Sequence, residues 1–566
     1  MVSPEILARA KEWLSPEYDK ETREAVMFML EKDEHELLEA FHKSLEFGTG
    51  GLRGIMGVGP NRMNVYTVAM ATQGLCNYLQ AQFPHELERR VAIAHDSRHN
   101  SQMFAEVASK VFSANGIRVY LFDDLRPTPE LSFAIRTLRC HCGVVLTASH
   151  NPKEYNGYKV YWQDGGQIVP PHDRNIIAEV QRISRIAEVN FNARPDLIQP
   201  IGRELDEVYL NAVASLSLSP DNNLKHSNLN IVYTPIHGTG IRLVPMALRR
   251  FGFAHVSLVQ EQCTPDGSFP TVPSPNPEEP AAMQLALERA RAIEAELVLG
   301  TDPDADRVGI GLRDAKGQLV LINGNQAAAL LLYYVLSRME ERNELERGQF
   351  VVKTIVTSDL LARIAEGFGV ECHEVLTGFK YISERIAALE GRQRFVAGGE
   401  ESFGYLVGDF VRDKDAVIAC CMFAEAAAWA KERGMSLHDV LLEVYARFGL
   451  YRERLVSLTK RGVDGAAQIA ALMARLRQSP PDQLGGSPVV RVVDYLQPSP
   501  LPKSDVLQLI TALGDKVSVR PSGTEPKIKL YFSVRSGARV SPSEVDAEVE
   551  VLERRIDRMV AELGVL

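Results

Sequence analysis

The turn at 147–152 presents Ser149, with His150 beside it, directly after a valine-rich apolar run. A serine after a strand can cap a helix, act as a nucleophile or carry a phosphoryl group. The nucleophile turn of an α/β-hydrolase has glycine two residues before and two residues after the serine. Thr147 and Asn151 occupy those positions, so the sequence excludes that mechanism. His150 is either a general base or a hydrogen-bonding neighbour.

Asp302, Asp304 and Asp306 alternate in a second polar turn, which also follows an apolar strand. If the turn is extended, alternate residues face the same way and the three carboxylates share one side. Carboxylate oxygens suit a hard divalent cation, above all Mg²⁺. A solvated acidic turn is the alternative, and the apolar strand before the turn favours the metal site. An EF-hand loop is excluded, because Arg307 and Arg313 stand where its glycine and final glutamate belong.

A third segment, 520–529, combines residue types that bind phosphate. An arginine offers a bidentate fork, hydroxyls donate, and a glycine lets backbone N–H groups approach an anion. The residues concerned are Arg520, Ser522, Gly523, Thr524 and Lys529. An ordinary turn before a strand is equally consistent with the segment, and the lysines that alternate into that strand favour an anion site.

Smaller signals surround these three segments. Glu400 and Ser402 share one side of a loop and could grip adjacent sugar hydroxyls, although a plain loop has the same spacing. The glycine-rich run 48–54 is no dinucleotide fingerprint, because Arg53 replaces its third glycine, and it lacks the Gly-Lys-Ser/Thr end of a P-loop. Arg53 is instead expected to reach a ligand. Lys159, in the strand after the serine turn, can assist proton transfer or stabilise phosphate.

Three stretches of the chain repeat a strand–helix–strand–helix–strand pattern. Strands are expected at 90–94, 118–122 and 142–146, at 230–233, 255–259 and 296–299, and at 350–354, 371–375 and 395–397. Such alternation predicts mixed or parallel sheets covered by helices. Ligands of open α/β sheets bind outside the carboxyl ends of strands. The turns that follow the third strand of each stretch are therefore expected to face one shared cleft.

The sequence thus predicts an α/β protein with three similar mixed α/β domains and a smaller C-terminal α+β domain around a central active-site cleft. Several short segments rich in proline and glycine, typical of turns, follow residue 451 or so and indicate the change to the last domain. The expected division is an N-terminal helical extension at 1–45 and domains at 46–208, 209–322, 323–450 and 451–566.

Composition excludes several classes of function. The net charge of −10 argues against a general nucleic-acid binder. The longest apolar stretch, 416–430, is interrupted by Glu425 and is too short to span a membrane, so it predicts a buried helix. Charged residues in the first turns do not suit a signal peptide. The seven cysteines include no CxxC pair, which indicates free thiols in a reducing cytoplasm and no thiolate metal site.

Taken together, five segments resemble the α-D-phosphohexomutase superfamily. They are 47–54, 147–152, 301–307, 399–404 and 520–529, and they occur in the order found in that family. The N-terminal helical addition and the Glu-Glu-Ser-Phe-Gly-Tyr loop are most similar to its phosphoglucomutase branch. That branch also contains phosphopentomutases and bacterial phosphoglucomutase/phosphomannomutases. The shorter phosphoglucosamine mutases fit less well.

The resemblance implies a role for each matched residue. Ser149 would be the phosphoserine, and its phosphate would bind Mg²⁺ together with the three aspartates. With the residues singled out above, the other predicted site residues are Lys159, Lys414, His150 and Arg53 for catalysis, and Glu400, Ser402, Thr377, Gly378, Arg307, Arg520, Ser522, Gly523, Thr524 and Lys529 for substrate. One departure is Lys529, where several family members carry arginine, so phosphate there would meet a point charge rather than a fork.

The predicted function is that of a cytoplasmic, Mg²⁺-dependent phosphosugar mutase that interconverts glucose 1-phosphate and glucose 6-phosphate. A sugar 1,6-bisphosphate would be intermediate and activator, and the fourth domain would close over the substrate to exclude water. Phosphopentomutase and phosphomannomutase are close alternatives. A metal-dependent phosphatase and a catalytically silent sugar-phosphate sensor are more distant ones. The sequence leaves open whether the protein is a monomer or a dimer.

Overall fold

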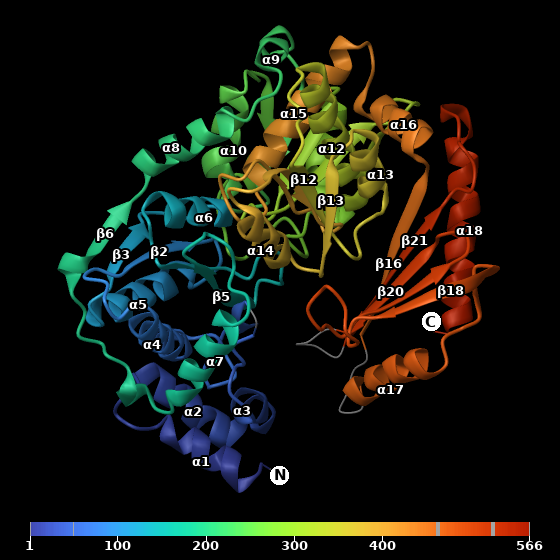
Figure 1. Cartoon of the computed structure of the whole chain (residues 1–566). Helices are drawn as coiled ribbons and strands as arrows, with labels where there is room; N and C mark the ends of the chain where they lie inside the picture. Colours follow the sequence, from blue (N-terminus) through green and yellow to red (C-terminus); the bar gives the residue numbers. More distant parts are fainter. Residues whose placement is uncertain (1, 49, 460–464, 522–526, 565–566) are drawn as a thin grey trace.

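The computed structural model describes residues 2–48, 50–459, 465–521 and 527–564. These residues form four β-sheets in chain order, and helices cover the first three in an α/β arrangement (Figure 1). The fourth sheet, orange to red in Figure 1, is antiparallel. The predicted fold class is therefore confirmed. We refer to each sheet with its helices as a unit, numbered one to four.

A helical extension precedes the first unit and packs on it. Its helices are α1 (Pro4–Glu12), α2 (Lys20–Lys32) and α3 (Glu34–Phe41). The first helix begins after Ser3, whose side chain accepts a hydrogen bond from the backbone N–H of Ile6 at 3.3 Å. Trp13 stacks on Tyr18 at 4.6 Å and meets Tyr66 of the first unit edge-on at 5.5 Å. This aromatic cluster fixes the extension to the first sheet.

The first unit has a mixed sheet of order β1-β5-β4-β2-β3-β6, with β2 parallel to β3 and β4. Its elements are β1 (Gly51–Ile55), α4 (Val65–Gln82), β2 (Arg90–His95), α5 (Ser101–Ala114), β3 (Arg118–Phe122), α6 (Thr128–Thr137), β4 (Cys142–Leu146), β5 (Tyr155–Trp162), α7 (His172–Arg182) and β6 (Ile198–Ile201). Alternate residues of β2 enter different cores: Val91 and Ile93 lie on the α4/α5 side, Ala92 and Ala94 on the α6 side.

The second unit has the order β11-β10-β9-β7-β8, in which β7 is parallel to β8 and β9. Its elements are α8 (Arg203–Ala214), α9 (Pro220–Lys225), β7 (Ile231–Thr234), α10 (Gly240–Arg250), β8 (Val256–Leu258), α11 (Pro280–Ala292), β9 (Leu297–Thr301), β10 (Val308–Arg313) and β11 (Leu319–Ile322). Strands β9 and β10 are antiparallel, so the aspartate turn joins the two strands of a hairpin.

The third unit has the order β13-β12-β14-β15. Its elements are α12 (Gly324–Glu341), β12 (Gln349–Thr354), α13 (Leu360–Gly367), β13 (Glu371–Val375), α14 (Phe379–Leu389), β14 (Arg394–Gly399), β15 (Tyr405–Val407), α15 (Ala416–Glu432) and α16 (Leu437–Phe448). Residues 416–430 are buried inside α15, which confirms the predicted buried helix. Across the described part of the chain, no helix combines the length and apolarity that a membrane crossing needs.

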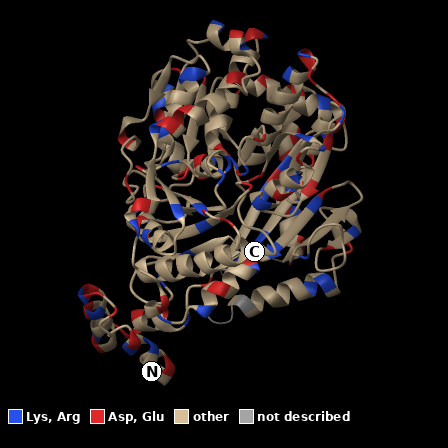
Figure 2. Cartoon of the chain, turned by 60° about the vertical axis from the view of Figure 1, so that its left-hand side comes forward, with Lys and Arg blue, Asp and Glu red and all other residues tan. Residues whose placement is uncertain are grey.

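The fourth unit has the order β16-β21-β20-β19-β18-β17. Its elements are β16 (Tyr451–Thr459), α17 (Gly465–Gln478), β17 (Gln483–Leu484), β18 (Ser487–Asp494), β19 (Leu507–Thr511), β20 (Lys516–Pro521), β21 (Lys527–Arg535) and α18 (Val545–Leu563). Short 3₁₀ helices lie at Ile186–Glu188, Pro195–Leu197, Gln260–Gln262 and Pro542–Glu544. Figure 2 shows that acidic and basic residues are distributed over elements throughout the fold.

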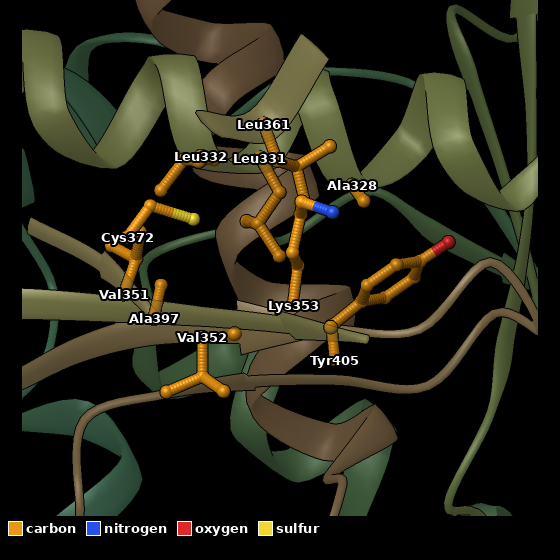
Figure 3. A pocket seen from close by; sticks show the side chains of 12 residues that line it. Ala328, Leu331, Leu332, Val351, Val352, Lys353, Leu361, Cys372, Ala397 and Tyr405 are labelled. Carbon is orange, nitrogen blue, oxygen red and sulfur yellow. The ribbon is translucent and has the colours of Figure 1, made fainter. Parts of the chain in front are cut away.

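A small void lies inside the third unit, between α12 and the sheet (Figure 3). Its volume is about 10 Å³, room for a single water molecule at most. Lys353 borders it, but the Lys353 ammonium is bound to Glu374 at 2.6 Å and to Asp359 at 2.9 Å. The thiol of Cys372 also borders the void, and burial raises its pKa to about 11. This void is a packing gap rather than a ligand site.

Candidate active site

The serine turn and the aspartate turn meet, although they belong to different units. Ser149 follows β4, Asp302 follows β9, and the Ser149 hydroxyl donates a hydrogen bond to Asp302 Oδ2 at 2.8 Å. The two turns lie at the carboxyl ends of strands, as predicted for ligand sites of such sheets. A phosphoryl group carried on the Ser149 oxygen would therefore lie directly against the aspartate turn.

Ser149 has an unusual backbone conformation. Its φ is +53°, in the left-handed region that side chains other than glycine, asparagine and aspartate rarely adopt. Its N–H donates to the Thr147 hydroxyl at 2.8 Å, and its own hydroxyl lies 3.1 Å from His150 Nδ1. Strain of this kind, held by surrounding bonds, is typical of functional sites.

The three aspartates converge by a route that differs from the prediction. The turn is curled rather than extended: Ala305 has a φ of +50°, and Asp302 Oδ1 accepts from the backbone N–H groups of Asp306 at 3.1 Å and Arg307 at 3.0 Å. One oxygen of each aspartate nevertheless lies within 4.8 Å of the others. The expected convergence of the carboxylates is therefore present, but the extended geometry inferred for it was wrong.

The aspartate triad fits a divalent cation. Among the described residues, the buried Oδ1 atoms of Asp304 and Asp306 accept no hydrogen bond. The second oxygens of both side chains are neutralised by ammonium groups, Lys159 at 2.7 Å from Asp304 and Lys414 at 2.7 Å from Asp306. Unpartnered buried carboxylate oxygens are costly, so a hard cation with oxygen ligands would complete the set.

The site shifts the pKa values of neighbouring carboxylates in opposite directions. Burial, together with Asp306 and Asp304, raises the pKa of Asp302 well above its usual value. Burial also opposes ionisation of Asp304, but Lys159 overcomes it and holds that pKa below the usual range. Lys414 keeps a raised pKa despite burial, because Asp306 lies beside it. Asp304 and Lys414 are therefore charged at neutral pH.

His150 is neutral in this environment. Burial lowers its pKa well below the usual value, and the nearby charges of Arg307 and Arg53 lower it further. A neutral imidazole keeps one ring nitrogen that can accept a hydrogen bond or a proton. Either predicted role of His150, general base or hydrogen-bonding neighbour of Ser149, therefore operates from the uncharged form.

The loop after β14 brings the predicted sugar-binding residues together. Glu400 Oε1 accepts from the backbone N–H of Gly378 at 3.0 Å, so the 377–378 segment and Glu400 form one surface. Burial and the adjacent Glu401 raise the pKa of Glu400 to about 7. Ser402 lies two residues further on and is partly exposed. Hydroxyl-binding groups are thus present in this loop.

Lys414 reaches the aspartates by passing over the loop that contains Glu400 and Gly404. A Cβ on Gly404 would lie 2.4 Å from Lys414 Cδ, so only glycine leaves room for this lysine. The next residue back, Asp413, accepts from the Tyr161 hydroxyl at 2.6 Å and lies 3.5 Å from the Lys414 ammonium. Tyr161 and Asp413 thereby orient Lys414 toward Asp306.

Two predicted arginines lie beside the serine and aspartate turns. Strand β1 pairs with β5, which places Arg53 where its guanidinium donates to Asn151 Oδ1 at 3.3 Å. Arg307 forms an ion pair with Glu278 and lies 3.9 Å from Asp306. Both cations are therefore close to the Ser149 turn.

The segment predicted to bind phosphate, 520–529, is described only at its two ends. Arg520 on β20 lies opposite Lys529 on β21, so two cations share one end of this hairpin. Burial and Lys527 lower the pKa of Lys529, and the nearby Glu401 opposes that shift. Ser522, Gly523 and Thr524 lie outside the described residues.

Comparison with known proteins assigns the chain to a family. Sequence models of phosphoglucomutase/phosphomannomutase α/β/α domains I, II and III match residues 44–187, 207–316 and 323–448. The chain belongs to the phosphoglucomutase/phosphomannomutase family. This agrees with the α-D-phosphohexomutase resemblance inferred from the five segments.

Relatives support the assignment over nearly the whole length of the family's chains. A phosphoglucomutase of Staphylococcus haemolyticus is 37% identical over 88% of this chain and 91% of its own, and one of Staphylococcus aureus is 36% identical over 90% and 93%. A putative phosphomannomutase structure from Thermus thermophilus shares the fold at a TM-score of 0.66 and 24% identity, covering 91% of this chain and 99% of its own.

Several site residues of this family member were missed by sequence reasoning. The Thr128 hydroxyl donates to Asp304 Oδ2 at 3.0 Å, and Arg98 donates to the backbone carbonyl of Ser149 at 2.7 Å. Tyr161, which orients Asp413, was also missed. A Thr-Pro-Glu helix start is visible around Thr128, but it signals only a helix. The contacts of all three residues are made across units or between loops, so no local spacing reveals them.

Proposed function

We propose that this chain interconverts glucose 1-phosphate and glucose 6-phosphate, with Ser149 as the phosphoryl carrier and glucose 1,6-bisphosphate as the intermediate. The family assignment makes it a hexose phosphate mutase, an isomerase. The observation that carries the proposal is the 2.8 Å contact between the Ser149 hydroxyl and Asp302 at the edge of the aspartate triad. That contact supports the proposal, because a phosphoryl group on Ser149 would lie beside carboxylates and lysines that could balance its charge.

In the forward step the bond between phosphorus and the Ser149 oxygen breaks, and a bond from phosphorus to the free sugar hydroxyl forms. The proton of the sugar hydroxyl leaves as the phosphoryl group arrives, and the departing Ser149 oxygen takes up a proton, so that a neutral serine hydroxyl is left. Neutral His150, 3.1 Å from the Ser149 oxygen, can accept a proton, whereas Lys414 is held charged by Asp306. His150 thus suits a base, and Lys414 suits an ion pair or a donor.

We infer that Asp302, Asp304 and Asp306 hold Mg²⁺ together with the phosphate of Ser149. The unpartnered oxygens of Asp304 and Asp306 support this ligand set. A bound divalent cation would offset charge on the transferred phosphoryl group. Lys159 and Lys414 already neutralise part of the negative charge of the triad, so the cation would have to balance only the remainder.

The bisphosphate must turn around so that its other phosphate returns to Ser149. Glu400 and Ser402 are proposed to bind sugar hydroxyls in both orientations, with Thr377 and Gly378 beside them. Arg520, Lys529 and the segment between them are proposed to hold the phosphate that is not being transferred. Because the bisphosphate binds in two orientations, a second phosphate site is needed at a distance from Ser149, and the fourth unit is proposed to supply it.

The substrate is tested with a panel of glucose, mannose, ribose and glucosamine 1-phosphates, each assayed with Mg²⁺ and catalytic bisphosphate. We expect the highest kcat/KM for glucose 1-phosphate. A higher value for mannose or ribose 1-phosphate would instead identify a phosphomannomutase or phosphopentomutase. Free phosphate as the main product would identify a phosphatase.

We also infer a reducing, cytoplasmic location. All seven cysteines are free thiols, and five of them are buried. Burial raises the pKa of Cys142 and Cys420 well above the usual value, so these thiols resist oxidation. Cell fractionation tests the inference, and recovery of the protein outside the cytoplasm would contradict it.

A further inference from the structure

Arg98 is buried behind the serine turn, and its side chain is 0% exposed. Its guanidinium donates to carbonyl oxygens of that turn: to Ser149 at 2.7 Å, to Asn151, to Pro152 at 2.8 Å and to Tyr155 at 3.0 Å. One planar group thus binds four carbonyls within seven consecutive residues. None of the assigned catalytic or substrate-binding roles includes Arg98.

These contacts explain how the Ser149 turn keeps its conformation. Ser149 has a φ of +53°, which is unfavourable unless surrounding contacts fix it. Buried carbonyls need hydrogen-bond donors, and the rigid fork of an arginine supplies several in one plane. Because the Ser149 carbonyl is itself bound, Arg98 fixes the peptide that follows the reactive serine.

The guanidinium is held in turn by Asp96. Asp96 Oδ2 lies 3.4 Å from Arg98 Nε, and both side chains are fully buried. The other carboxylate oxygen of Asp96 accepts from the backbone N–H of Arg98 at 2.9 Å and from the Ser101 hydroxyl at 2.7 Å. Asp96 directly follows β2, so the first sheet sets the position of Arg98.

The second unit completes the arrangement. The ring of Phe269 lies over the guanidinium, with 5.1 Å from Arg98 Cζ to the ring centroid. Beside it, His99 Nε2 lies 2.8 Å from the Ser268 hydroxyl. A Cβ on Gly267 would lie 2.3 Å from the backbone nitrogen of His99, so the 266–269 turn fits only with glycine there.

We propose that Arg98 is a positioning residue for phosphoryl transfer. It fixes the Ser149 turn of the first unit against the aspartate turn of the second, by binding four carbonyls on one side and Phe269 on the other. The inference rests on the proposed role of Ser149 as phosphoryl carrier. Arg98 acts through the backbone of the turn and not on the Ser149 oxygen.

The test compares Arg98→Lys with Arg62→Lys. Lysine keeps the charge of Arg98 but cannot bind four carbonyls in a plane. Arg62 is a matched control: it is 6% exposed, and it binds Glu36 Oε1 at 2.9 Å and the Glu39 carbonyl at 3.3 Å, so these bonds join it to α3 rather than to the Ser149 turn. For each variant we would measure the single-turnover rate of Ser149 phosphorylation by glucose 1,6-bisphosphate, kcat, KM and the thermal midpoint.

We expect Arg98→Lys to lower the phosphorylation rate and kcat by about 100-fold, the effect of a misplacement near 1 Å. KM should stay near the wild-type value, because the sugar-binding loop is not touched. Arg62→Lys should lose stability without losing rate. A wild-type rate in Arg98→Lys, or a loss that only follows its folded fraction, would overturn the proposal.

If Arg98→Lys does not fold, Asp96→Asn and Phe269→Leu test the same arrangement from its two supports. Both should slow phosphorylation of Ser149 by about tenfold, since each loosens the guanidinium without removing it. Unchanged rates in both would reject the positioning role. The wild-type protein distinguishes this failure from failure of the mutase mechanism: if wild-type Ser149 takes up no phosphate, the mechanism itself fails and the role of Arg98 with it.

Discussion

The residues of the proposed active site owe their contacts and charge states to neighbours in other units. Ser149 is one serine among many in the sequence, and its distinctive property is the hydroxyl contact with Asp302 at 2.8 Å. Asp304 is ionised because the Lys159 ammonium lies 2.7 Å away. Lys414 is charged because the Asp306 carboxylate lies 2.7 Å from its ammonium. The alternation of the aspartates in sequence shows which residues are involved, whereas these charge states follow only from their contacts.

Glu400 gives a pH dependence at the residue scale. Burial and Glu401 raise its pKa to about 7, so it is mostly protonated below that pH and accepts hydroxyl hydrogen bonds more weakly than the carboxylate does. We expect kcat/KM for glucose 1-phosphate to fall about tenfold per pH unit as the pH drops below 7. A pH profile of kcat/KM from 5.5 to 8.5 measures this, although Glu400 titrates together with Glu401.

Glu400→Gln is the control for that profile. The second ionisation of the substrate phosphate, with a pKa of about 6, remains in the variant and must be separated from the enzyme group. We expect Glu400→Gln to have a lower kcat/KM and to lose the step near pH 7 while keeping the substrate's own step. An unchanged step near pH 7 in Glu400→Gln would assign it to another group.

At the scale of elements, strands were predictable and turn conformations were not. β-branched and apolar runs predicted β3 and β4 with the observed bounds, because strand formation depends on local side-chain type. The left-handed conformations of Ser149 and Ala305 carry no such signal, since neither is glycine. Those conformations result from hydrogen bonds that residues distant in sequence provide, such as Arg98.

A substitution of Gly324, the first residue of α12, tests how this helix positions the loop that we propose binds the sugar. A Cβ there would lie 1.9 Å from the carbonyl oxygen of Glu401. We expect Gly324→Ala to displace the Glu400 loop, to raise KM and to cost about 1–3 kcal/mol of stability, as overpacking does. Gly537→Ala is the control, because nothing lies within 4 Å of its Cβ position. Equal KM values in the two variants would contradict this account.

Helix α15 carries two glutamates whose replacement should differ in cost. Glu425 is fully buried and accepts from the Leu218 N–H at 2.8 Å, from Asn223 at 2.6 Å and from Tyr334 at 2.8 Å. We expect Glu425→Gln to lower the free energy of unfolding by about 2–3 kcal/mol, because the buried donors lose an ionic acceptor.

Glu432, on the same helix, is 42% exposed and pairs with Lys225 and His226. Glu432→Gln should cost much less than Glu425→Gln, because exposed ion pairs contribute little to stability. Urea denaturation of both variants measures the difference. Similar costs would mean that the hydrogen bonds of Glu425 do not stabilise the packing of α15 against residues 218–223.

At the scale of the whole molecule, the site depends on how the units are held against one another. The fourth unit meets the third through an ion pair of Lys516 with Asp359 at 2.9 Å, and through an apolar cluster that includes Ile355, Tyr495 and Tyr531. The sequence predicted four units and their order, because each motif is local. Their relative placement, and contacts such as that of Thr128 with Asp304, arise from packing between units and have no sequence signature.

Cation binding should stabilise the whole molecule. A cation that binds only the folded protein adds about 2.7 kcal/mol to the free energy of unfolding at a hundred times its Kd. We expect Mg²⁺ to raise the Tm of the wild-type protein and to have little effect on Asp304→Asn. Asp314→Asn, in the neighbouring β10–β11 turn, is the control and should respond like wild type. An equal Mg²⁺ response in wild type and Asp304→Asn would place the cation elsewhere.

The most direct test of the central claim follows a labelled phosphoryl group through Ser149. Wild-type protein and Ser149→Ala are incubated with labelled glucose 1,6-bisphosphate, freed of sugar, and chased with unlabelled glucose 1-phosphate. In the wild-type protein we expect label on Ser149, and we expect this label to move to the sugar during the chase. Ser149→Ala should take up no label, and its kcat should fall by more than about a thousandfold. Full mutase activity in Ser149→Ala, or label released only as free phosphate, would contradict the account.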